Sequence, residues 1–254
     1  MSQDQNDIVP PEVERVRHEL KRRTLTVAAA DYITPAMRRI TFVCPELADF
    51  ISAAPDDHIK LFFDTGEEKP AMRDYTPRRY DNDRRSLTID FAIHDAGPAT
   101  AWAVAARPGD TLEIGGPRGS AVVKGPVAHW LLIGDETALP AIGRRIEEAE
   151  AGASVTAIIA VPSSDDRQVF GTEADVDLRW IDRAGAVATD PAPFLGALRD
   201  VDLPPQTFAW IGAEARVARA ARNFLVEERG HPLTWMNASG YWVADQAGVS
   251  EKNM

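Results

Sequence analysis

Residues 129–134 read HWLLIG, and the hydrophobic pattern of this 254-residue chain changes at this run. From here on, apolar runs alternate with helical patterns: strands are expected at 129–134, 155–161, 178–181 and 208–211, and helices over 139–150, 193–199 and 214–229. Strands that alternate with helices predict a parallel sheet with crossover helices. Because these strands are apolar throughout, both faces of the sheet should be covered.

Upstream of the run, apolar residues follow a period of two. The clearest case is 87–94, and the same alternation appears at 24–27, 39–42 and 58–63. Such alternation is typical of half-buried strands. Turn residues, such as Pro-Gly-Asp at 108–110, separate the strands. Several short strands with turns between them predict an antiparallel β-barrel.

The predicted fold class is therefore β followed by α/β, in three segments. We expect an N-terminal tail and short helix over 1–21, the antiparallel barrel over 22–125 and the parallel-sheet domain over 126–254. The short helix is expected because acidic residues at 12 and 14 precede basic residues at 21–23, an order that suits the helix dipole. Two ligands can meet where a barrel edge faces the carboxyl ends of parallel strands.

Composition narrows the classes of function. The net charge of −11 argues against binding to nucleic acid or to anionic membranes. The single cysteine, Cys44, can form no intramolecular disulfide, and the five histidines show no metal-ligand spacing, so we expect no resident metal. No apolar run approaches the roughly 18 residues of a membrane span. The N-terminal residues lack a signal-peptide core, so we expect no membrane insertion and a cytoplasmic location.

Residues 73–78 read RDYTPR and are the first candidate for ligand chemistry. A tyrosine ring can stack on a flat cofactor, a threonine hydroxyl can bond ring heteroatoms, and an arginine fork suits a phosphate. Read alone, such a segment is more often an exposed edge strand. A small-residue loop at 97–100 precedes a helical pattern over 101–106. A helix that starts after such a loop is typical of a phosphate site.

An ordered set of motifs continues from this segment. R-x-Y-T-x-R at 73–78 is followed by D-F-x-x-H at 90–94, G-P-A-x-x-W-A at 97–103, P-G-D at 108–110 and G-P-x-G at 116–119. In this order the motifs resemble the ferredoxin–NADP reductase superfamily, and more narrowly the siderophore-interacting protein family of flavin-dependent ferric-siderophore reductases. Further matches lie at 57–63, 134–142, 210–214 and 240–242, so the resemblance covers residues 22–243.

For the barrel, the resemblance implies an FAD site. Tyr75 and Thr76 would lie at the isoalloxazine ring, Arg78 at the diphosphate, and the loop at 97–100 would cradle the pyrophosphate. Trp102 would either contact the adenine end or belong to the core. The implied FAD-binding residues are Arg73, Tyr75, Thr76, Arg78, Asp90, Ala92, His94, Gly97, Pro98, Ala99, Thr100 and Trp102.

For the α/β half, the resemblance implies a site for NADPH or NADH. The half has no G-x-G-x-x-G fingerprint. Instead, Asp135, Glu136, Thr137 and Ala138 lie between its first strand and helix, in the place of a phosphate loop. Two carboxylates there are unfavourable for an anion, and they favour contacts to hydroxyl or amide groups.

The last long helix carries two more candidates for nucleotide binding. Glu214 opens this helix, where it either reaches the nicotinamide or flavin region or stabilises the helix dipole. Arg216, in the first turn, is a candidate phosphate contact. The choice between NADPH and NADH stays open, because Arg167 after the second strand favours a 2′-phosphate while Asp165 and Asp166 oppose it.

The resemblance further implies that an anionic ferric siderophore, or another ferric chelate, binds at Lys60, His58 and Trp242. Alternation places His58 and Lys60 on one face of their strand, and a local basic platform attracts such a chelate. The chain departs from the family pattern at Val243, where a basic residue usually follows the tryptophan. Lys252 in the C-terminal tail is a candidate replacement.

These inferences together predict an NAD(P)H-dependent, FAD-containing ferric-siderophore reductase. Hydride would pass from nicotinamide to flavin, and single electrons from flavin to Fe(III), which is released as Fe(II). The protein would supply binding, orientation and electrostatics, so no catalytic side chain is predicted. Two alternatives stay open. One is another FAD electron-transfer reductase, of the ferredoxin or flavin reductase kind, with ferredoxin as a candidate partner; the other is a siderophore-binding carrier without redox chemistry.

Overall fold

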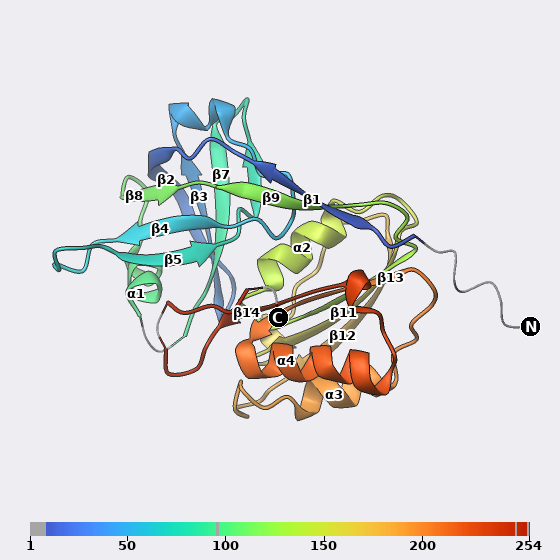
Figure 1. The fold of residues 1–254 in the computed structure, drawn as a ribbon. Coiled ribbons are helices and arrows are strands. Elements are labelled where there is room, and N and C mark those ends of the chain that lie inside the picture. Colours follow the sequence, from blue (N-terminus) through green and yellow to red (C-terminus); the bar gives the residue numbers. More distant parts are fainter. Residues whose placement is uncertain (1–8, 95–96, 247, 253) are drawn as a thin grey trace, which may run out of the picture.

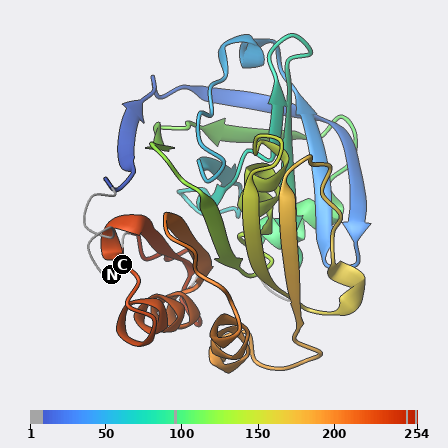
Figure 2. The same ribbon diagram turned by 90° about the vertical axis from the view of Figure 1, so that its right-hand side faces the viewer.

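The computed structural model describes residues 9–94, 97–246, 248–252 and 254. The chain forms a curled antiparallel sheet beside a five-stranded parallel sheet with helices (Figure 1, Figure 2). The predicted class, β followed by α/β, is confirmed. Within the described residues, no helix combines the length and the apolar character that crossing a membrane requires.

The curled sheet is a half-barrel of seven strands in the order β5-β4-β8-β2-β3-β7-β6. Neighbouring strands pair antiparallel throughout. Its inward side chains form one core, as a period of two predicts, with Leu25, Phe42 and Phe91 fully buried. The strands are β2 (Arg22–Thr34), β3 (Met37–Val43), β4 (Ile59–Phe63), β5 (Ala71–Tyr75), β6 (Arg79–Asp81), β7 (Ser86–Ala92) and β8 (Thr111–Gly115).

The helix expected within residues 1–21 is wrong, because this segment contains a strand. β1 (Glu12–Arg17) pairs antiparallel with β9 (Gly119–Lys124), and Lys124 forms an ion pair with Glu14. The charge order that suggested a helix is worth at most about 1 kcal/mol at an exposed helix end. Pairing with β9 instead satisfies the backbone donors and acceptors along one edge of β1. The partner strand lies far away in the chain, so local charge could not reveal it.

The parallel sheet has the strand order β12-β11-β10-β13-β14. From β10 the chain adds β11 and β12 on one side, and then crosses over to add β13 and β14 on the other side. The boundary between β10 and β13 is therefore a topological switch point, where a crevice for ligands opens at the carboxyl ends of the strands. Sequence analysis missed β14, whose residues MNASGYW mix polar, small and aromatic types. The strands are β10 (His129–Gly134), β11 (Ser154–Val161), β12 (Asp175–Asp182), β13 (Thr207–Glu214) and β14 (Met236–Trp242).

Helices cover both faces of the parallel sheet. α2 (Leu139–Glu147) lies between this sheet and the half-barrel, whereas α3 (Ala192–Arg199) and α4 (Ala215–Asn223) cover the outer face (Figure 1). The helix expected over 214–229 has two parts, because α4 continues as a π-helical turn over Phe224–Glu228. α1 (Pro98–Ala105) packs on the half-barrel. Short 3₁₀ turns lie at Pro45–Asp49, Ser164–Asp166 and Leu233–Trp235.

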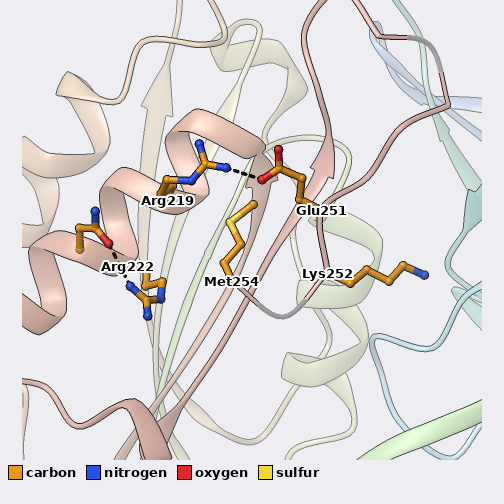
Figure 3. Close-up of a pocket in the computed structure, with 6 residues that line it drawn as sticks. Arg219, Arg222, Glu251, Lys252 and Met254 are labelled. Carbon is orange, nitrogen blue, oxygen red and sulfur yellow. Dashed lines mark hydrogen bonds and ion pairs between the residues drawn. The ribbon is translucent and has the colours of Figure 1, made fainter.

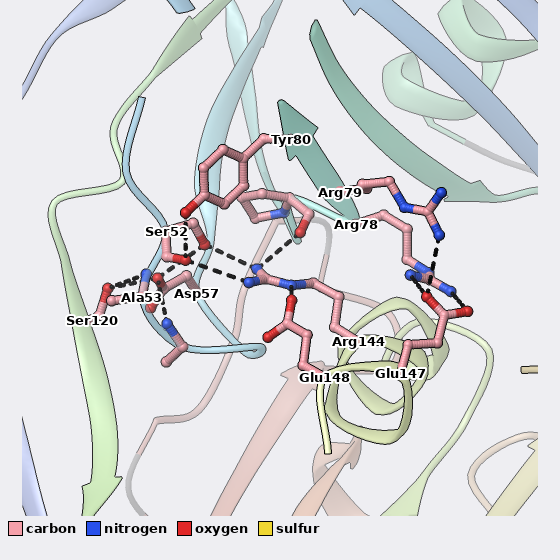
Figure 4. A network of polar contacts seen from close by, with 12 residues as sticks. Ser52, Ala53, Asp57, Arg78, Arg79, Tyr80, Ser120, Arg144, Glu147 and Glu148 are labelled. Carbon is pink, nitrogen blue, oxygen red and sulfur yellow. Dashed lines mark hydrogen bonds and ion pairs between the residues drawn. The ribbon is translucent and has the colours of Figure 1, made fainter. Parts of the chain in front are cut away.

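Buried arginines join the two halves through α2 (Figure 4). Arg144 of α2 donates hydrogen bonds to Ser52 Oγ at 2.9 Å and to the Pro77 carbonyl at 3.0 Å, both in the half-barrel. In the opposite direction, Arg78 after β5 donates two hydrogen bonds of 2.7 Å to the carboxylate of Glu147. Buried charges are tolerated only when they are paired. These contacts therefore hold α2 against the half-barrel.

Candidate functional site

A cleft of about 1490 Å³ lies between the half-barrel and the parallel sheet. Single small-molecule sites usually measure about 300–1,000 Å³, so this cleft has room for more than one ligand. The predicted site residues that line it are His58, Lys60, Arg73, Tyr75, Thr76, Asp90, Ala92, His94, Gly97, Ala99, Thr100, Glu136, Thr137 and Trp242. The fold thus brings residues predicted for three different ligands to one space.

The end of β5 supplies a flat aromatic wall to the cleft. Tyr75 packs against Phe91 of β7, with ring centroids 4.6 Å apart. Burial raises the pKa of the Tyr75 phenol, so this group stays protonated at neutral pH. Thr76, the next residue, is buried and also lines the cleft. This wall can receive a planar ring and offers it a hydroxyl beside the ring edge.

The first turn of α1 is a candidate anion site at the same cleft. Its N-cap is Gly97 at φ 121°, a conformation that favours glycine, and no side chain caps the helix. Thr100 in this turn is 8% exposed, and its Oγ1 has no hydrogen-bond partner within the described residues. An uncapped helix start with a free hydroxyl fits a diphosphate. The chemistry of this cradle agrees with FAD.

The nearby carboxylate of Asp90 does not oppose an anion there. Arg39 donates two hydrogen bonds of 2.7 Å to it from the neighbouring strand β3. Because a bidentate arginine neutralises a buried carboxylate, Asp90 contributes packing and hydrogen-bond acceptors to the cleft wall rather than a free negative charge.

Several residues predicted for the site lie elsewhere. Arg78 is directed to Glu147 on α2, as described above. Trp102 packs in the half-barrel core against Phe42, Phe63 and Phe91, at centroid distances of 6.0–6.1 Å. The predicted residues that do not line the cleft are Arg78, Pro98, Trp102, Asp135, Ala138, Glu214 and Arg216. Their ligand roles stay predictions.

Asp135 is the first residue of the β10–α2 loop and is 3% exposed. Its Oδ1 accepts hydrogen bonds from the backbone and hydroxyl of Thr137 at 2.9 and 2.5 Å. Its Oδ2 accepts from the Glu214 backbone and from Trp242 Nε1, both at 2.9 Å. Four uncharged donors therefore surround this carboxylate, and both of its oxygens are satisfied within the protein.

Glu136, the second acid of this loop, forms an ion pair with an arginine. Arg183, which follows β12, donates two hydrogen bonds to it at 2.7 and 2.6 Å. Burial raises the pKa of Glu136 and Asp135 adds to this rise, while Arg183 opposes both. The unfavourable pair of carboxylates inferred from the sequence is thus compensated by contacts that the sequence does not display.

Gly134, directly before the loop, is required by close packing. A Cβ at this position would lie 2.7 Å from the Gly212 carbonyl oxygen and 2.8 Å from Ile142 Cδ1. The absence of a side chain lets β10, β13 and α2 converge, and this convergence places the loop at the switch point.

Glu214 caps α4 instead of facing the cleft. It is fully buried, and its Oε2 accepts hydrogen bonds from the backbone of Arg216 at 2.7 Å and of Val217 at 3.3 Å. Its Oε1 accepts from the Ala244 backbone at 3.3 Å. The helix-stabilising interpretation of Glu214 agrees with this geometry.

Two lysines gather around one carboxylate at the half-barrel rim. Lys60 Nζ lies 2.7 Å from Asp74 Oδ1, and Lys252 Nζ lies 3.6 Å from Asp74 Oδ2. Lys252 Nζ also lies 2.6 Å from His58 Nε2, and burial lowers the pKa of this histidine. Two positive charges facing one negative charge leave the group a local excess of positive charge.

The C-terminal segment places Lys252 there by folding back along β14. Glu251 and Gly240 form an antiparallel bridge. Glu251 also forms an ion pair with Arg219 of α4, while Lys252 points away from α4 (Figure 3). The return of the segment depends on contacts with distant residues, so sequence analysis could only name Lys252 as a candidate.

Another wall of the cleft was not foreseen. Ser120 Oγ lies 2.7 Å from His18 Nε2 and 2.6 Å from Asp57 Oδ2. The pairing of β1 with β9 brings these residues together, and no local motif signals it. Exposed arginines that also line this end of the cleft are Arg15, Arg17 and Arg118. Among the described residues, no group of three or more His, Cys, Asp or Glu side chains could hold a metal ion.

Comparison with known proteins gives matches over both halves. A family model described as siderophore-interacting FAD-binding domain matches residues 26–68 and 64–121, and one described as siderophore-interacting protein matches residues 127–245. An NADPH-dependent ferric-chelate reductase of Escherichia coli (strain K12) is 32% identical over 253 residues, which cover 91% of this chain and 96% of that protein.

Solved structures agree. A siderophore utilization protein from T. fusca superposes with a TM-score of 0.86 at 36% identity, over 93% of this chain and 98% of that chain. The siderophore-interacting protein SipS from Aeromonas hydrophila superposes with a TM-score of 0.76 at 30% identity, over 91% and 93%. Since the matches extend through the half-barrel and the parallel sheet alike, the chain belongs to the siderophore-interacting protein family.

Proposed function

We propose that this protein is an NAD(P)H-dependent, FAD-containing ferric-siderophore reductase. The observation that carries the proposal is the single large cleft. It joins the aromatic wall at Tyr75 and the uncapped start of α1 to the β10–α2 loop at the switch point of the parallel sheet. The cleft therefore has room for a flavin and a nicotinamide side by side.

FAD would be held by the half-barrel. Tyr75 and Thr76 would contact its ring, and the first turn of α1, with the Thr100 hydroxyl, would bind its diphosphate. Arg73 lines the same cleft and is a further candidate phosphate contact. When bound, FAD would supply the chemistry that converts a two-electron transfer from the donor into two one-electron transfers to iron. The name of the Escherichia coli relative supports NADPH as that donor.

The parallel sheet would orient the nicotinamide nucleotide. Thr137 and Glu136 line the cleft from the β10–α2 loop. Because Arg183 neutralises Glu136 and internal hydrogen bonds satisfy Asp135, this loop can approach a phosphate without strong repulsion. A nicotinamide donor also fits a reaction that takes place in the cytoplasm, which we propose as the location.

The ferric chelate would approach the rim that carries Lys60, Lys252 and His58, with Trp242 as an aromatic neighbour. Lys252 supplies a positive charge at a rim where Val243 does not. Excess positive charge at a cleft mouth raises the local concentration of an anionic ligand, even on a protein with a net charge of −11.

The absorbance spectrum of the purified protein tests the first half of the proposal. We expect flavin bands, and we expect NADPH or NADH to bleach them under anaerobic conditions. Adding a ferric siderophore should then restore the bands and form Fe(II), measured with a ferrous indicator dye. A colourless protein that binds ferric siderophore would instead indicate a carrier.

A comparison of acceptors tests the second half. Ferric siderophore, free flavin and ferredoxin are offered to the reduced protein at equal concentration. We expect the ferric chelate to be the fastest acceptor. If ferredoxin or free flavin reoxidises the protein faster, the alternative electron-transfer reductase replaces this proposal.

A further inference from the structure

Trp242 ends the last strand of the parallel sheet and lines the cleft. The next residue, Val243, forms an isolated antiparallel bridge with Gln246, so the regular sheet ends at this indole. The β13–β14 pairing contains a register shift between Ala213 and Glu214, and the shift sets Glu214 opposite Trp242. Such bulges redirect side chains at sheet ends.

Two buried carboxylates hold this indole and the chain beside it. Asp135 Oδ2 accepts the Trp242 Nε1 hydrogen bond at 2.9 Å. Glu214 Oε1 accepts from the Ala244 backbone at 3.3 Å, two residues further along the chain. The two residues are also linked to each other, because the Glu214 backbone N–H donates to the same oxygen of Asp135 at 2.9 Å.

The burial of these acids separates their role from ligand binding. Asp135 is 3% exposed and Glu214 is fully buried, and neither lines the cleft. Each carboxylate oxygen of Asp135 already accepts two hydrogen bonds. Trp242, by contrast, is half-buried and lies at the cleft surface.

We propose that Asp135 and Glu214 are positioning residues that clamp Trp242 as a fixed wall of the cleft. The clamp sets the shape of the space offered to the ferric chelate, and it is assembled in the free protein before any ligand arrives. The effect on the chelate rests on the proposed function, whereas the clamp itself does not.

The free protein tests the clamp directly. The chain has six tryptophans, and Trp242→Phe identifies the indole N–H signal of Trp242 in a ¹⁵N-labelled sample. We expect Asp135→Asn to shift this signal strongly, because the indole N–H loses its charged acceptor and faces either a neutral oxygen or an amide donor. Thr137→Val removes one donor on the other oxygen and should leave the signal in place. An unmoved signal in Asp135→Asn overturns the clamp, whether or not the protein reduces iron.

Kinetics test the consequence. Asp135→Asn removes the charged acceptor of this hydrogen bond and Trp242→Phe removes its donor, so each should raise the KM for the ferric chelate by about five- to tenfold. The double variant should show no more than the effect of one substitution. FAD affinity, measured by titration of the apoprotein, should stay unchanged. Multiplying effects in the double variant, or a change in the KM for NADPH alone, overturns the assignment.

If Asp135→Asn does not fold, Trp242→Phe and Glu214→Gln carry the test. Glu214→Gln weakens the bond to the Ala244 backbone without touching the indole N–H. We expect it to broaden the Trp242 signal and to raise the KM for the chelate. A sharp, unshifted signal together with an unchanged KM would contradict the role of Glu214.

Discussion

In and around this cleft, polar side chains of the kind that bind ligands can instead be used to stabilise the fold. Asp135 and Glu136 lie in the expected place for a nucleotide, yet each is satisfied by partners within the protein. Thr100 is the opposite case, since its buried hydroxyl has no partner in the described part of the chain. A buried polar atom without a partner is costly to the fold, and the position of Thr100 in the first turn of α1, at the cleft, makes its hydroxyl a candidate ligand contact.

Thr100 therefore gives a residue-scale prediction. Replacing Thr100 with Val should weaken FAD binding by about tenfold, because a hydrogen bond to a charged group is lost. The same change should leave the apoprotein equally stable or slightly more stable, since an unsatisfied hydroxyl is removed. Titration of the apoprotein with FAD and thermal unfolding without FAD measure the two effects. Thr100→Ser keeps the hydroxyl and should bind FAD normally; equal loss in both variants would contradict the role.

At the scale of elements, β10, β13 and α2 depend on a close approach at Gly134. The Gly-Asp-Glu-Thr-Ala stretch suggested a phosphate loop from the sequence, and the structure adds a packing reason for its glycine. By contrast, the secondary structure of β1 depends on its partner strand. Its residues pair with β9 although their charge order favours a helix.

Gly134→Ala gives the element-scale prediction. The added Cβ would meet a backbone carbonyl at 2.7 Å, so we expect a loss of about 1–3 kcal/mol in the free energy of unfolding. Gly196→Ala in α3 is the matched control, because no atom lies within 4 Å of its Cβ. That change should stabilise the protein by about 0.5–1 kcal/mol. Urea unfolding compares the two, and equal effects would contradict the packing argument.

At the scale of the whole molecule, two sets of contacts between the half-barrel and the parallel-sheet domain shape the cleft and its mouth. The arginine contacts of α2 hold the parallel sheet against the half-barrel, and the C-terminal segment returns from the sheet to the half-barrel rim. The first set shapes the cleft, and the second adds a lysine to its mouth.

The contact between Arg78 and Glu147 predicts a pH dependence. Burial works to raise the pKa of Glu147, but the hydrogen bonds and charge of Arg78, together with the charges of Arg79 and Arg39, outweigh it and the pKa is lowered. A carboxylate with a lowered folded pKa adds stability above its unfolded pKa, and this stability is lost as pH falls through the folded value. Arg78→Met should therefore cost about 3 kcal/mol at pH 7 and less near pH 4.

Urea unfolding at both pH values measures this difference. Arg79→Met is the control, because Arg79 is exposed and lies 3.6 Å from the same carboxylate. An exposed pair is worth about 0–1 kcal/mol. A loss for Arg78→Met that does not change between pH 7 and pH 4 would contradict the linkage.

Lys252 gives a prediction about the substrate. Lys252→Gln should weaken binding of an anionic ferric catecholate by several-fold at low salt, and the difference should shrink at high salt as the charge is screened. An uncharged ferric chelate should bind equally to both proteins. Lys124→Gln is the control, because Lys124 pairs with Glu14 and does not line the cleft. An equal effect of both substitutions would contradict a local role.

The sequence by itself determined the fold class, the family and part of the cleft lining, because alternation, apolar runs and ordered motifs are local properties of the chain. Tertiary structure alone decided that Arg78 contacts Glu147, that Trp102 lies in the core and that β1 is a strand. It also decided that Asp135 contacts Trp242 and that Lys252 returns to Asp74. These outcomes depend on which distant donor, acceptor or surface a side chain meets, and local sequence carries no record of such partners.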